Sequence, residues 1–150
     1  MFPPGRIVCL TEETVETLYL LGEQDRIVGI SGYAVRPPQA RREKPRVSAF
    51  ISADIDKILA LTPDLVLTFS DLQADIAAAL IRHGLDVHAL NQRSVAAILD
   101  MIHTLGAMVN ASERARELAA ALEARLADVR SWGKRLPKRP RSSSKNGTIR

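Results

Sequence analysis

The sequence lacks the features that mark several classes of protein. Cys9 is the single cysteine among 150 residues, so no internal disulfide can form and the cysteine count indicates no compartment. No apolar run approaches the roughly 20 residues that a membrane-spanning helix needs, which predicts a chain that does not span a membrane. Residues 1–6 show neither a charged leader nor an apolar signal segment. We therefore expect no signal peptide in the chain as given, which leaves a cytoplasmic location open.

Sequence motifs of common catalytic and cofactor-binding sites are missing too. The sequence has no G-x-G-x-x-G motif for dinucleotides, no G-x-S-x-G nucleophile turn and no phosphate-binding loop. His83, His88 and His103 are scattered, and no pair has the spacing of metal ligands. Cys9 ends an apolar segment, where a small buried hydrophobic side chain is expected rather than a reactive thiol. We expect a protein that is not an enzyme and holds no cofactor or metal of its own.

The net charge of +4 comes from the end of the chain. Residues 131–150 hold seven lysine or arginine residues and no acidic ones, which leaves 14 basic against 17 acidic side chains elsewhere. The remainder is mildly acidic, so we expect no nucleic-acid partner. Residues 137–150 combine this basic charge with Pro137, Pro140 and a serine run, and we predict a disordered basic tail there.

Short apolar segments alternate with helical patterns along the first part of the chain. The apolar segments are Ile7 to Leu10, Ile27 to Ile30, Leu65 to Leu67 and Val87 to Leu90. The helical patterns are Glu13 to Leu21, a short one from its cap Asp54 to Thr62-Pro63, Leu72 to Ile81, and Val95 to Met108 capped by Ser94. This alternation predicts an α/β fold, a Rossmann-like parallel sheet with helices on both faces. Residues 32–53, with three prolines, are expected to form a long loop.

A long amphipathic helix is predicted after this lobe. Its apolar stripe is formed by Ala115, Leu118, Leu122, Leu126 and Val129. We therefore divide the chain into an α/β lobe (1–110), a long helix (111–136) and the basic tail (137–150).

Aromatic residues make up only 4% of the chain, and three of the six are expected in loops. Tyr33, Phe50 and Phe69 fall in loops at what should be one carboxyl edge of the sheet, where open α/β sheets bind ligands. Flat aromatic faces suit a bulky, partly planar ligand. Packing over the sheet edge is the alternative that the residues leave open. The polar residues at the same edge are Thr11, Ser70 and Asp71.

Four further segments form a recognisable series: Arg6 to Thr11, Ile27 to Ser31 with Tyr33 and Pro37-Pro38 behind it, Val47 to Phe50, and Ile58 to Leu67. Together, in this order, they resemble the cobalamin and ferric-siderophore class of solute-binding proteins of ABC importers. The resemblance implies a non-enzymatic first lobe that binds cobalamin or a ferric siderophore, and a helix 111–136 that crosses to a second lobe. It also implies an ABC-importer permease as partner and a periplasmic or other extracytoplasmic location.

The resemblance also implies roles for individual residues. The family places ligand-facing aromatic side chains at Tyr33, Phe50 and Phe69, with tryptophan common at the last two, so phenylalanine here keeps apolar contact but loses indole N–H donors. Asp56 aligns with a glutamate that pairs with a permease arginine, and an exposed pair of that kind would guide orientation and association rate. A solvated helix acid is the alternative for Asp56.

The resemblance ends near Pro140, where a second lobe should begin. Codons compatible with Ser142 to Arg150, read in another frame, allow an apolar strand followed by an acidic, aromatic loop. This predicts that residues 137–150 contain a frameshift and that the second lobe is missing. The competing interpretation of the whole chain is an intracellular α/β domain, enzymatic or regulatory, with a small-molecule site at the same edge.

Overall fold

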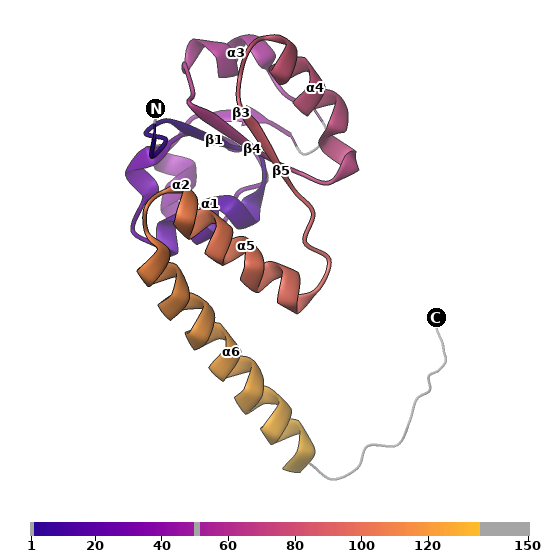
Figure 1. Cartoon of the computed structure of the whole chain (residues 1–150). Helices are drawn as coiled ribbons and strands as arrows, with labels where there is room; N and C mark the ends of the chain where they lie inside the picture. Colours follow the sequence, from indigo (N-terminus) through magenta and orange to yellow (C-terminus); the bar gives the residue numbers. More distant parts are fainter. Residues whose placement is uncertain (1, 50–51, 136–150) are drawn as a thin grey trace, which may run out of the picture. The chain divides into compact units, whose positions relative to one another are not determined.

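The structure, a computed structural model, describes residues 2–49 and 52–135 (Figure 1). Its strands are β1 (Ile7–Cys9), β2 (Ile27–Ser31), β3 (Arg46–Ser48), β4 (Leu65–Phe69) and β5 (Val87–Leu90). Its helices are α1 (Glu12–Leu20), α2 (Pro38–Glu43), α3 (Ile55–Ala60), α4 (Ala74–Arg82), α5 (Val95–Met108) and α6 (Ser112–Arg135), with 3₁₀ turns at Gln24–Arg26 and Asp71–Gln73. By the contacts of its described residues the chain divides into two units, with the division after Ala119.

The five strands form one parallel sheet in the order β3-β2-β1-β4-β5. At its centre β1 pairs with β4, and Ile7 lies opposite Leu65. Helices α1 and α5 cover one face, whereas α3 and α4 cover the other (Figure 1). The predicted α/β fold with a parallel sheet and helices on both faces is confirmed. The direction of chain progression reverses between β1 and β4, and open α/β sheets bind ligands at the carboxyl ends of the strands at such a switch point.

Local signals set the ends of the helices as the sequence predicts. The Asp54 carboxylate accepts a hydrogen bond from the Lys57 amide at 3.0 Å and so caps α3. The Ser94 hydroxyl accepts from the Ala97 amide at 3.1 Å and caps α5. After α4, Gly84 takes a φ of +85°, a left-handed conformation that favours glycine and ends the helix.

The prediction of a long loop at residues 32–53 is wrong for its middle part, which contains α2 and β3. Pro38 stands at the start of α2, where a missing N–H costs no helical hydrogen bond. In β3, Val47 is buried against the sheet and the strand pairs with β2. The prolines that suggested a loop therefore mark the beginning of a helix and the approach to an edge strand. The basic run does lie at the surface as expected, with Arg41 and Arg42 exposed.

The core has an apolar layer on each face of the sheet. On the α3 and α4 face, the buried cluster consists of Val8, Leu10, Val47, Ile58, Val66, Ile76 and Leu80. On the other face, α1 and α5 contribute the buried residues Val15, Leu18, Met101, Ile102 and Leu105. Cys9 is buried as expected, and its burial raises the pKa of the thiol to about 12, so it is neutral at ordinary pH.

One buried hydroxyl lies on β4 without a hydrogen-bond partner among the described residues. Thr68 is fully buried, and its Oγ1 contacts no donor or acceptor there. Replacing Thr68 with valine should raise the free energy of unfolding by about 1 kcal/mol, because it removes an unpaired buried polar atom while keeping the shape. Urea denaturation measures the change.

Thr14→Val is the matched control for that substitution. The Thr14 hydroxyl is equally buried but lies 2.9 Å from the Thr11 hydroxyl and donates to the Thr11 carbonyl at 3.2 Å. Its loss should lower stability by about 1 kcal/mol. If both variants lose the same stability, the unpaired state of Thr68 is refuted.

The long helix α6 begins within the first unit. Its first two turns carry Ala115 and Ala119, which are buried. Further along the predicted stripe, Leu122 and Leu126 are only partly buried and Val129 is 65% exposed. Among the described residues, none of the helices combines the length and apolar character required to cross a membrane. The predicted tail, 137–150, lies outside the described residues, and the division at 110 and 136 stays a prediction.

Candidate functional site

The candidate site is the carboxyl edge of the sheet around the switch point between β1 and β4. Each parallel strand ends at this edge, so the segments that follow them share it. Thr11 comes after β1, Tyr33 after β2, and Ser70 and Asp71 after β4. The fold therefore brings those predicted site residues that the structure describes to the carboxyl edge of the sheet.

Two of the three predicted aromatic residues can be placed. Tyr33 is 61% exposed, and its amide donates to the Ser31 hydroxyl at 3.1 Å, which fixes the backbone just after β2. The sequence predicts Phe69 in a loop, but it is the last residue of β4. It is partly buried. Phe50 lies outside the described residues. Tyr33, two residues after β2, is therefore exposed, whereas Phe69, at the end of β4, is only partly accessible.

The predicted polar residues differ in what they can offer a ligand. Thr11 is only 2% exposed, and its hydroxyl is engaged by Thr14. Ser70 is buried as well, and its hydroxyl accepts from the Leu72 amide at 3.2 Å. By contrast, the Asp71 side chain is 86% exposed, with Arg93 at 3.7 Å. Of the three, Asp71 has the most accessible polar group, whereas Thr11 and Ser70 shape the loops.

Ser70 occupies a special backbone conformation. Its φ is +55°, in a region that residues other than glycine rarely adopt. The strand is held at this point because the Ser70 amide donates to the Leu90 carbonyl of β5 at 2.7 Å. The chain then turns at once into Asp71–Gln73 and α4. A sharp turn thus follows Phe69 and directs the chain away from the sheet edge.

Gln73 is a site residue that sequence reasoning missed. Its side chain is completely buried. The Oε1 atom accepts from the Phe69 amide at 2.8 Å, and Nε2 donates to the Leu10 carbonyl at 3.0 Å. A glutamine at the start of a helix looks like a surface residue in the sequence, and only the fold brings Leu10 within reach.

Asp56 lies in the first turn of α3 and is exposed. Helix α3 follows β3, so its beginning lies on the carboxyl side of the sheet. An exposed carboxylate in this position is accessible to a partner protein.

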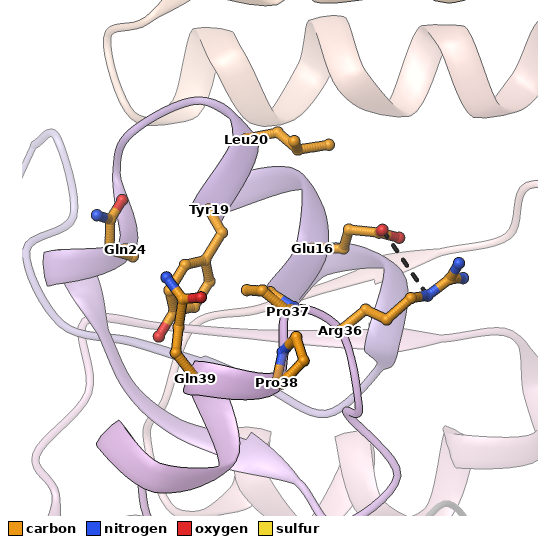
Figure 2. A pocket seen from close by; sticks show the side chains of 8 residues that line it. All are labelled: Glu16, Tyr19, Leu20, Gln24, Arg36, Pro37, Pro38 and Gln39. Carbon is orange, nitrogen blue, oxygen red and sulfur yellow. Dashed lines mark ion pairs between the residues drawn. The ribbon is translucent and has the colours of Figure 1, made fainter.

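A hollow is lined by residues of α1 and of the segment that leads into α2. It has a volume of about 390 Å³ and is lined by Glu16, Tyr19, Leu20, Gln24, Arg36, Pro37, Pro38 and Gln39. Figure 2 shows Tyr19 facing α2 residues, with Arg36 paired to Glu16 at 3.8 Å. The Tyr19 hydroxyl donates to Glu43 at 2.7 Å; burial and this bond raise its pKa. None of the predicted site residues lines this hollow.

Residues 2–49 and 52–135 contain no cluster of side chains that could bind a metal ion. No group of three or more histidine, cysteine, aspartate or glutamate side chains there could hold an ion.

Comparisons with known proteins identify relatives over most of the chain. The profile of the periplasmic binding protein family matches residues 7–142. A vitamin B12-binding protein of Vibrio cholerae serotype O1 is 30% identical over 131 residues, which are 87% of this chain and 47% of that protein. An uncharacterized ABC transporter substrate-binding lipoprotein of Bacillus subtilis is 26% identical over 139 residues, 90% of this chain and 44% of that protein.

Solved structures agree with these sequence matches. The crystal structure of the periplasmic vitamin B12 binding protein of Vibrio cholerae superposes with a TM-score of 0.78 at 30% identity. The superposition covers 88% of this chain and 52% of that chain. The chain therefore spans about half the length of the relatives it matches.

Proposed function

Because the chain belongs to the periplasmic binding protein family, we propose that it forms the first lobe of a solute-binding protein that supplies an ABC importer. The family resemblance seen in the sequence is confirmed. The ligand is cobalamin or a related iron chelate or corrinoid, bound at the carboxyl edge of the sheet. Binding needs no bond making or breaking, so the protein is not an enzyme.

The observation that carries this proposal is that an exposed aromatic residue and a partly exposed one stand at the carboxyl ends of two strands of one sheet. Tyr33 follows β2 and Phe69 ends β4, with β1 between these strands. Two rings separated by a strand give a broad apolar surface, which matches a macrocycle better than a small metabolite. Asp71 adds an exposed acceptor for peripheral N–H or O–H groups.

The partner follows from the family and from α3. The Bacillus subtilis relative is a substrate-binding lipoprotein of an ABC transporter. Asp56, exposed at the carboxyl side of the sheet, would pair with a basic side chain of the permease. Such a rim contact contributes to association rate and orientation more than to affinity. The relatives' periplasmic and lipoprotein descriptions support an extracytoplasmic location for this chain.

Replacing Phe69 with alanine should weaken cobalamin binding while leaving the fold intact. The loss should be about 1–3 kcal/mol, the value of a buried aromatic contact, or roughly 5- to 150-fold in Kd. Titration of the isotope-labelled chain with cyanocobalamin, followed by backbone amide shifts in NMR, measures both the affinity and the residues affected. Shifts should gather around Tyr33, Phe69 and Asp71.

Leu67→Ala is the control for stability. Leu67 is fully buried on the same strand, so its truncation leaves a cavity and should cost roughly 2–5 kcal/mol of stability. Phe69→Ala should cost less. Shifts that gather around the Tyr19 and Pro37 hollow instead, or no shifts with either cyanocobalamin or hemin, would refute the proposed site.

A further inference from the structure

The backbone hydrogen bonds between β1 and β4 stop after Leu10, at the switch point of the sheet. In a parallel pair, a residue of one strand donates its amide to one neighbour on the other strand and accepts at its carbonyl from the residue two positions further on. The Leu10 amide donates to the Leu67 carbonyl at 2.9 Å. The next bond of this pattern would run from the Phe69 amide to the Leu10 carbonyl.

The Gln73 side chain stands where that bond would be. Its Oε1 accepts from the Phe69 amide at 2.8 Å and its Nε2 donates to the Leu10 carbonyl at 3.0 Å. An amide side chain has the same donor and acceptor as a peptide group, so Gln73 acts as an inserted peptide unit between two strands that diverge. The divergence itself arises because β1 leads to α1 and β4 leads to α4, which lie on opposite faces of the sheet (Figure 1).

We propose that Gln73 is a positioning residue that holds Phe69 in place at the proposed ligand site. This inference rests on the proposed function. It fixes the Phe69 amide on the β1 side, and the bond from the Ser70 amide to the Leu90 carbonyl fixes the next residue on the β5 side. The backbone that carries the ring is therefore held from both neighbouring strands.

A first measurement uses the unaltered chain. The side-chain NH₂ of Gln73 should exchange with solvent far more slowly than that of Gln39, which is exposed on α2. The Phe69 amide should be protected as well. Rapid exchange of the Gln73 NH₂ would overturn the proposal without any variant.

The second measurement compares Gln73→Met with Leu80→Ala, both followed by NMR. Methionine keeps the length of the side chain but loses both hydrogen bonds, whereas Leu80→Ala destabilises the fully buried, apolar side of α4. In Gln73→Met, amide exchange at Phe69 should accelerate at least tenfold beyond the global change in stability, and the Phe69 ring signals should shift. Leu80→Ala should change exchange at Phe69 only in proportion to global stability.

Ligand affinity gives an independent result. Gln73→Met should weaken cyanocobalamin binding at least fivefold, and Leu80→Ala less than twofold. Unchanged exchange and ring signals at Phe69, or equal affinity loss in the two variants, would overturn the positioning role. If the unaltered chain binds neither cyanocobalamin nor hemin, the proposed function fails, and exchange with ring signals still decides whether Gln73 holds Phe69.

Discussion

Replacing Gly106 with alanine is expected to lower the free energy of unfolding by more than about 3 kcal/mol, a large share of the 5–15 kcal/mol of a typical domain. A Cβ at this position would lie 2.3 Å from the Ala115 Cβ and 3.1 Å from the Ala111 carbonyl oxygen. Both neighbours belong to the start of α6 or the turn before it, so α5 and α6 would have to separate. The gain in helix propensity, about 1 kcal/mol, is too small to offset this.

The second-site change Ala115→Gly tests the cause. It removes the atom that the new methyl group would strike, so the double variant should regain more than half of the lost stability. Guanidinium denaturation followed by circular dichroism gives the three free energies. If Gly106→Ala is as stable as the unaltered protein, or if Ala115→Gly brings no recovery, the close approach of these helices is refuted.

Extending the chain by a second lobe is expected to raise its affinity for cyanocobalamin at least about 100-fold. One or two buried apolar contacts on an opposite wall, at roughly 1.5–3 kcal/mol each, account for such a factor. The extended protein would be made by reading the segment after Pro140 in the alternative frame and continuing it. Titration calorimetry compares the two proteins, with Phe69→Ala in each as the control.

Equal affinities of the short and the extended protein would contradict both the two-lobe site and the frameshift hypothesis. If the extended protein binds tightly and Phe69→Ala weakens it, the first lobe supplies a wall of the site. Tight binding that is indifferent to Phe69→Ala would place the ligand on the second lobe alone. The genomic sequence around codon 141 decides independently whether the alternative frame is open.

Much of the fold could be predicted from the sequence because the signals are local. The segments at β1, β2, β4 and β5 are apolar and are separated by helical patterns, and the caps Asp54 and Ser94 mark where helices begin. Edge strand β3 escaped prediction because it has only three residues, and two of them, Arg46 and Ser48, are polar. An edge strand is recognised by its pairing with a neighbour, which no local pattern shows.

The candidate site was only partly predictable for the same reason. Topology alone brings Tyr33 and Phe69 to one edge, so their shared location could be expected once strands were assigned. The role of Gln73 depends on Leu10, which is 63 residues away in sequence. The burial of Thr11 likewise depends on packing that its neighbours in sequence do not reveal. Before the fold was known, Gln73 and Thr11 could not be told apart from ordinary polar residues at the surface.

The central place of β1 has a consequence for how the chain folds during synthesis. The strand is made first, yet its partner on one side, β4, begins only at Leu65. Until the ribosome has released that segment, a nascent chain exposes an unpaired apolar edge, since contacts so distant in sequence form late. The lobe can begin to close once Ala115 emerges and meets Gly106. Ala119, the last residue of this unit, adds a further buried side chain, so the apolar surface of the nascent lobe is not fully covered until it too has left the ribosome.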